Sequence, residues 1–166
     1  MAGSLLATTH GLAEEPPPLK IGYVNLVKVF DGYQRTQESE GVLEQKGKQK
    51  QTELEGRVNE LNKLRQGLEL LNDQARTSKA REIEEKADAF QQFKTKAQRE
   101  LVRERDRIAS QVLDEIEQGI EEYAKANGFS VILDKRSLLY AQQAYEVTDG
   151  VLQFLNARYA GKKTPR

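Results

Sequence analysis

The chain has 166 residues, of which 31% are charged and 37% are hydrophobic, and its 26 basic and 26 acidic side chains give a formal net charge of zero. The length indicates a single domain, and the charge balance argues against a nucleic-acid-binding protein with a bulk positive field. The chain contains no cysteine, which excludes disulfides, thiol nucleophiles and cysteine metal sites.

The first thirteen residues are small and weakly apolar, and Gly11 and Ala13 suit the small positions of a signal-peptide cleavage site. They lack the basic start and the longer apolar run of a complete signal. Two interpretations stay open: a truncated signal peptide or misassigned start, and a disordered tail or expression scar. Residues 14–18 predict an extended linker, because consecutive prolines favour polyproline II.

Two short β-forming ends flank a long polar middle. Residues 20–25 predict a strand, and residues 26–33 predict a short helix anchored by Val27, Val29 and Phe30. Residues 34–127 contain no proline and carry thin apolar stripes at helical spacing. Because isolated strands are marginal in water, the two ends must meet, and the middle must leave and return as a helical hairpin.

The outgoing helix carries a stripe of apolar residues three and four positions apart, typical of a coiled-coil seam. Its members are Leu54, Val58, Leu61, Leu64, Leu68, Leu71 and Ala75. Four glycines fall in this helix, and each costs about 1 kcal/mol relative to alanine; they are Gly41, Gly47, Gly56 and Gly67. Either the resulting softness is useful, or the glycines are tolerated or permit close helix approach.

Residues 72–78 are the expected tip of the hairpin, because Asn, Asp, Thr and Ser favour turns and caps. Thr77 or Ser78 is the expected cap of the returning helix, and Glu82 and Lys86 are expected to pair along it. A local basic patch at the tip consists of Arg76, Lys79 and Arg81. The stripe of the returning helix comprises Ile83, Ala87, Phe90, Phe93, Ala97, Leu101, Ile108, Val112, Ile116, Ile120 and Tyr123.

The C-terminal part predicts two more strands and a last helix. Gly128 suits a left-handed helix end, residues 129–133 and 138–141 predict strands, and Thr148 predicts an N-cap. The inner face of the last helix is expected to hold Val151, Leu152, Leu155 and Tyr159. The fold class is therefore α+β, with a body of residues 20–33 and 128–160, an arm of residues 34–127, and tails at 1–19 and 161–166.

A thin apolar stripe cannot fill a thick core, so burial requires partner chains and an oligomer is expected. The residues assigned to the body core and the subunit contacts are Ile21, Tyr23, Val131, Leu133, Leu139 and Tyr140. No catalytic constellation is present in the sequence: His10 is the single histidine, and there is no phosphate-binding loop or nucleophile elbow. No enzyme activity, cofactor or metal is expected.

Three segments carry a resemblance to a known family: KIGYVN at residues 20–25, VILD at 131–134 with LLY at 138–140, and VTDGVL at 147–152. Together, over residues 20–156, the chain resembles the Skp/OmpH family of periplasmic chaperones. The resemblance implies a jellyfish-shaped homotrimer, with a small β-barrel body shared between subunits and coiled-coil arms around a cavity. It also implies an ATP-independent holdase that binds unfolded outer-membrane proteins in the periplasm.

Under this resemblance, the candidates for contact with clients are Leu64, Leu68, Phe90 and Phe93. Closing the seam within one arm is the simpler role for most of them, yet Phe90 and Phe93 lie three residues apart, which leaves one free to face a client. The neutral charge departs from the strongly basic members of the family, so we expect at most weak contact with a membrane surface and no nucleic-acid partner. A structural coiled-coil adaptor that joins folded partners is the alternative function.

Overall fold

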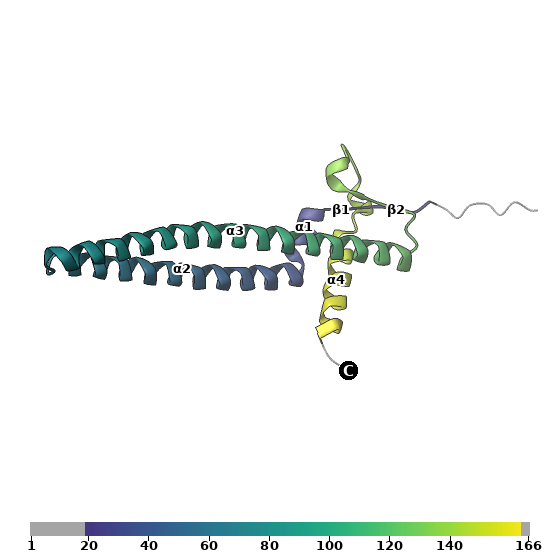
Figure 1. Ribbon diagram of the computed structural model, residues 1–166. Coiled ribbons are helices and arrows are strands. Elements are labelled where there is room, and N and C mark those ends of the chain that lie inside the picture. The colour runs from purple at the N-terminus through teal and green to yellow at the C-terminus, as the bar shows by residue number, and fades with distance from the viewer. Residues whose placement is uncertain (1–18, 164–166) are drawn as a thin grey trace, which may run out of the picture.

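The computed structural model describes residues 19–163 as a small body from which a long helical hairpin projects (Figure 1). The elements are β1 (Ile21–Val24), α1 (Leu26–Gly32), α2 (Gln34–Leu68), α3 (Asp73–Ala126), β2 (Val131–Asp134) and α4 (Thr148–Lys163), with 3₁₀ turns at Lys135–Ser137 and Gln143–Tyr145. The signal-like start and the proline linker lie outside the described residues. Because α4 continues to Lys163, the prediction of a tail from residue 161 is wrong for residues 161–163.

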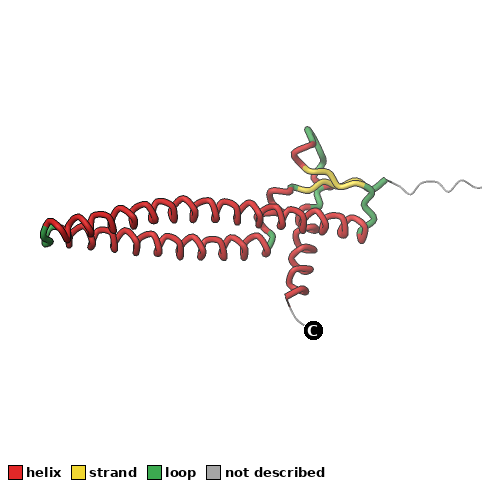
Figure 2. The backbone as a smooth tube through the Cα atoms, viewed as in Figure 1, coloured by secondary structure: helices red, strands yellow, loops and turns green. Residues whose placement is uncertain are grey.

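The two ends of the chain meet in a parallel strand pair, as the sequence predicts. Ile21 lies opposite Val131 and Val24 lies opposite Asp134, and Figure 2 shows the two strands side by side. A parallel pair requires a long crossover, which α1, α2 and α3 supply. On its other side β1 accepts a 2.9 Å hydrogen bond from the Val147 N–H to the Tyr23 carbonyl oxygen, so β1 is central and β2 is the outer strand.

The predicted third strand at residues 138–141 is wrong. These residues form an irregular loop, and the sheet of the described chain contains β1 and β2 alone. Both sides of β1 are occupied, and no segment of residues 19–163 pairs with the free edge of β2. A strand needs a neighbouring backbone to satisfy its N–H and C=O groups, and residues 138–141 find none within this chain.

The arm is a hairpin of α2 and α3, whose ends are fixed by local caps. Tyr33 leaves the helical region (φ −73°, ψ 123°) and separates α1 from α2. Asn72 caps α3, accepting a 3.0 Å hydrogen bond from the Ala75 N–H. The prediction that Thr77 or Ser78 caps this helix is therefore wrong, because Asn72 caps it five residues before Thr77. Ala75 accordingly belongs to α3. Gly128 has φ 68°, which confirms the left-handed helix end.

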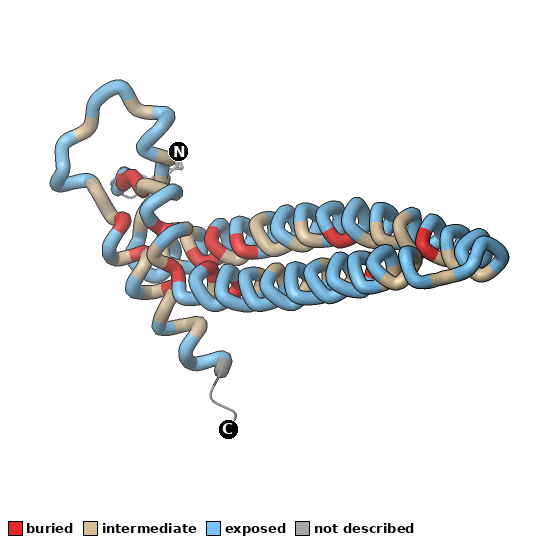
Figure 3. Tube along the Cα trace, turned by 90° about the vertical axis from the view of Figure 1, so that its left-hand side faces the viewer, coloured by how far each residue is buried: buried red, intermediate tan, exposed pale blue. Residues whose placement is uncertain are grey.

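The core lies where the arm enters the body, and the arm itself is mostly exposed (Figure 3). The residues buried at this junction are Val24, Val29, Tyr33, Val112, Ile116, Val151 and Leu155, with Leu152 and Tyr159 packed against them. The inner face predicted for the last helix is thus confirmed. The prediction for Val27 is wrong, since this side chain is 53% exposed. Leu26, Val29 and Phe30 form the buried face of α1, and Val27 lies outside that face.

Close contacts fix α4 against the arm base. Thr148 is the first residue of α4, and its hydroxyl accepts the Asn25 N–H at 3.0 Å, which joins the end of β1 to the start of α4. At Gly119 of α3, a Cβ atom would collide with the Leu155 side chain, so only glycine permits this approach. No helix within residues 19–163 is both long enough and apolar enough to span a membrane.

The four glycines of α2 have a different environment. A Cβ atom built at Gly41, Gly47, Gly56 or Gly67 would meet nothing within 4 Å. Close helix approach therefore does not explain them. At each of these positions the helix is less stable than it would be with alanine.

Candidate functional site

Ion pairs connect α2 to α3 along the arm. Lys46 binds Glu104 at 2.8 Å and Lys86 binds Glu60 at 2.7 Å. Hydrogen bonds from Arg107 and then Lys46 lower the pKa of Glu104 to about 2. The predicted pairing of Lys86 with Glu82 within α3 is wrong, because Glu60 on the facing helix is within reach. Such exposed pairs contribute little to stability individually, but they orient one helix against the other.

The apolar seam of the arm is thin. Beyond the junction with the body, only Leu61, Ile83 and Ala97 of the seam are buried. The remaining members are half-buried and include all four predicted client contacts: Leu54, Leu64, Leu68, Leu71, Ala75, Ala87, Phe90, Phe93, Leu101 and Ile108. Val58, predicted in the seam, is 39% exposed. The arm therefore presents partly accessible apolar surface within a charged exterior.

The two phenylalanines of the arm have different surroundings. The Arg57 guanidinium lies 4.3 Å from the centre of the Phe93 ring, and the Lys50 ammonium lies 5.2 Å from it. Both distances suit cation–π attraction. Phe90 instead lines a surface hollow of about 410 Å³ together with Leu54 and Val58. Phe93 is thus occupied by cations of α2, while Phe90 borders open space.

The tip of the arm carries basic side chains and one exposed leucine. Arg76 and Arg81 are exposed, while Lys79 binds Glu82 at 2.6 Å, which offsets part of the predicted basic patch. Leu70 lies in the turn between α2 and α3 and is 89% exposed. Sequence reasoning missed Leu70, because it stands outside the seam spacing.

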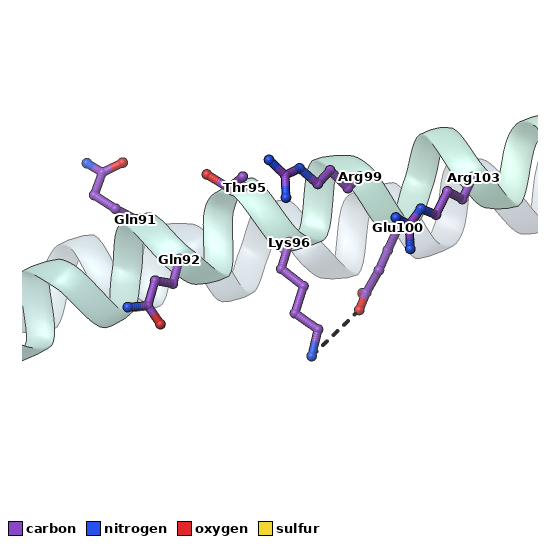
Figure 4. Close-up of a pocket in the computed structure, with 7 residues that line it drawn as sticks. All are labelled: Gln91, Gln92, Thr95, Lys96, Arg99, Glu100 and Arg103. Atoms are coloured by element: carbon purple, nitrogen blue, oxygen red, sulfur yellow. Dashed lines mark ion pairs between the residues drawn. The ribbon is translucent and has the colours of Figure 1, made fainter.

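A polar hollow of about 530 Å³ lies along the middle of α3 (Figure 4). Its lining residues are Gln91, Gln92, Thr95, Lys96, Arg99, Glu100 and Arg103. Lys96 faces Glu100 at 3.9 Å, whereas Arg99 and Arg103 have no ion pair within residues 19–163. The hollow is a solvated, net basic face of one helix, and the sequence analysis did not single it out.

The outer face of the sheet collects the predicted oligomer residues. Ile21 and Tyr23 lie opposite Val131 and Leu133 in the strand register, so all four share one face. Ile21, Tyr23, Leu133 and Tyr140 line a hollow of about 480 Å³. Tyr23 is buried, whereas Tyr140 is 82% exposed and Leu139 is fully exposed. This face also includes Leu19 and Tyr145, which the sequence analysis missed because neither falls in a periodic segment.

Tyrosines anchor the base of the arm. The Tyr33 hydroxyl donates to Glu115 at 3.2 Å, and the Tyr159 hydroxyl donates to Glu38 at 2.9 Å. The two rings meet edge to face with centroids 5.8 Å apart. These contacts join α2 and α3 to α4, so the direction of the arm is tied to the body through side chains that the sequence pattern alone did not connect.

Comparisons with known proteins agree with this architecture. The family model described as "Outer membrane protein (OmpH-like)" matches residues 20–155. "Chaperone protein Skp" of Yersinia enterocolitica is 30% identical over 147 residues, which cover 81% of this chain and 84% of that protein. A crystal structure of a protein from Caulobacter crescentus CB15, described as a "putative outer membrane chaperone (OmpH-like)", matches with a TM-score of 0.77 at 23% identity, covering 92% of this chain and 90% of that one. At this level of identity, the structural match supports the fold alone.

Proposed function

The chain belongs to the OmpH-like outer membrane protein family, and from this premise we propose that it is an ATP-independent holdase chaperone of the periplasm. Membership in a family with chaperone relatives implies a non-enzymatic role. In the proposed function the protein binds unfolded outer-membrane proteins between helical arms and prevents their aggregation. Three chains join through a shared β-barrel body into a homotrimer, and their arms surround the client.

The observation that carries this proposal is the arm surface. Its apolar side chains are half-buried and are interrupted by charges, so any one contact with an unfolded chain is weak. Several arms on one body raise the effective concentration of such contacts, so that binding becomes firm while each contact stays reversible. A holdase needs this combination, because a tight specific pocket would hinder release.

The exposed face of the sheet supports the proposed assembly. Ile21, Val131 and Leu133 stay partly exposed, and Leu139 and Tyr140 extend from the adjacent loop. An apolar face beside an unpaired strand edge is a site for association with another chain. A second and a third copy would cover it and would supply the neighbouring backbone that residues 138–141 lack.

An aggregation assay tests the function. An unfolded outer-membrane β-barrel protein is diluted from urea with increasing amounts of this protein, and light scattering is followed. A holdase suppresses scattering at stoichiometric ratios without nucleotide. A coiled-coil adaptor for folded partners would leave the scattering unchanged, and that result would refute the proposal.

A further inference from the structure

We propose that residues 54–58 of α2 form a cover over the phenylalanines of the arm, and that this cover opens to admit client segments. The inference rests on the proposed holdase function and assigns its binding site and its moving part. The aromatic site consists of Phe90 and Phe93, the only phenylalanines in residues 34–127.

The cover lies beside both rings. Arg57 lies over the ring of Phe93, while Leu54 and Val58 border the hollow beside Phe90. One turn of α2 therefore lies over the Phe93 ring and forms one side of the hollow at Phe90. Displacing this turn would expose more of the two rings, which lie three residues apart on α3.

Gly56 makes the cover the weak part of this region. A glycine inside a helix is less stable than alanine, because it loses more backbone freedom on folding. No packing compensates for this loss, since a Cβ atom at Gly56 would meet nothing within 4 Å. The glycine thus weakens the closed state without serving helix contact.

Arg57 adds a second, independent weakness in the same turn. Its Nε atom is buried without a hydrogen-bond partner, one of only two such side-chain atoms within residues 19–163. Its terminal nitrogen binds Glu53 at 2.8 Å. A buried donor without a partner is unfavourable, and opening would return it to water. Two destabilising features therefore coincide in the turn of α2 that faces the aromatic site.

The facing helix is built differently. α3 contains no glycine between residues 73 and 118, so it remains a continuous helix that holds Phe90 and Phe93 in position while α2 yields. Proteins open locally where backbone hydrogen bonds are exposed and packing is sparse. The exposed turn around Gly56 meets both conditions.

The occupant is an unfolded polypeptide segment that presents an aromatic or aliphatic side chain. The hollow at Phe90 has about 410 Å³ and mixed polar and apolar walls, including Lys94 and Glu55. These charges face any backbone that enters, while the ring contacts its apolar side chain. Since the cover and the client compete for the rings, the apparent dissociation constant rises when the closed cover is stabilised.

The variant Gly56→Ala tests the device, with Gly41→Ala as the matched control. Both glycines are exposed and free of contacts, but Gly41 lies outside the cover. We expect Gly56→Ala to slow hydrogen exchange of residues 51–61 about fivefold and to weaken client binding about fivefold. Gly41→Ala should leave both quantities at the wild-type value.

Client binding is measured with an unfolded, tryptophan-bearing β-barrel protein, whose fluorescence is specific because this chain has no tryptophan. Equal affinity for wild type and Gly56→Ala, with slowed exchange in the variant, would overturn the cover. Equal weakening of client binding by Gly41→Ala would also overturn it, because a stiffer α2 at any position would then explain the loss of affinity. A wild-type protein that binds no client refutes the holdase function itself, a result that the glycine variants cannot produce.

Discussion

The hydroxyl of Tyr33 donates a hydrogen bond of 3.2 Å to Glu115, across the point at which the two arm helices enter the body. The Tyr33 side chain is buried and stacks edge to face on Tyr159. Burial, and then the charge of Glu115, raises the pKa of Tyr33 to about 12. The arm base therefore contains a proton that the folded state holds more tightly than the unfolded chain does.

This raised pKa predicts a loss of stability in alkali. Tyrosine in an unfolded chain titrates near pH 10. The contribution of Tyr33 to the free energy of unfolding should therefore be constant below that pH and should fall between about pH 10 and 12. In Tyr33→Phe the fall should be shallower, because the titrating proton is absent. Urea denaturation at a series of pH values measures both slopes. Burial also raises the pKa of Tyr23, and Tyr23 remains in the variant, so part of the fall in stability should persist. Identical slopes for the variant and the wild type would contradict the assignment to Tyr33.

The close approach of α4 to α3 predicts that Gly119 cannot be replaced. In Gly119→Ala the new methyl group would meet the Leu155 side chain, and overpacking of this kind destabilises by about 1–3 kcal/mol. The control is Gly41→Ala, where the added methyl group meets nothing, and which should be neutral or stabilising by up to about 1 kcal/mol. Denaturant midpoints of both variants measure the difference. A Gly119→Ala protein as stable as wild type would show that α4 is free to shift.

The exposed face of the sheet predicts the effect of a charge on assembly. Tyr140→Asp should reduce the mass in solution to that of a single chain while helical content is retained, because a buried unpaired carboxylate opposes association and Tyr140 contributes little to the chain's own core. Analytical ultracentrifugation gives the mass, and circular dichroism gives the helical content. Gln143→Asp is the control, since Gln143 is exposed but does not line the hollow. An intact oligomer in Tyr140→Asp would remove this face from the assembly.

The arm aromatics predict weaker client holding after truncation. The double variant Phe90→Ser and Phe93→Ser should suppress aggregation less at equal concentration, because two rings are lost from the contact surface. The mass in solution should not change, since both residues lie in the arm. A matched double variant at exposed polar positions of α3, Gln91→Ser and Gln92→Ser, controls for effects on the helix. Unaltered suppression by the phenylalanine variant would count against these residues as client contacts.

The sequence revealed those parts of the fold that depend on local pattern. Long apolar stripes predicted α2 and α3, the β-forming ends predicted the meeting of residues 21–24 with 131–134, and Gly128 predicted the end of α3. Tertiary context decided the rest. Residues 138–141 have strand-forming composition, but a strand also requires a neighbour, and periodicity says nothing of which edges are free.

The pairing of residues across the arm was equally beyond sequence pattern. The contact of Arg57 with Phe93 depends on the register between α2 and α3, which the turn at residues 69–72 sets. The sequence analysis placed the tip at residues 72–78 and so did not locate the turn on which this register depends. The cap was misplaced because Asn72, Asp73, Thr77 and Ser78 all have capping side chains, and only the geometry of the turn selects Asn72.

The parallel pairing of the two strands has a consequence for the order of folding. Lys20 and Ser130, which are hydrogen-bonded at the start of the pair, stand 110 residues apart in the chain. A contact over such a distance carries a large loop-closure entropy and forms slowly in an unstructured chain. Collapse of the hairpin shortens the path between the ends, so that zippering of the arm brings the first strand to the last. The emerging N-terminal strand therefore waits for the rest of the polypeptide before it can acquire its partner.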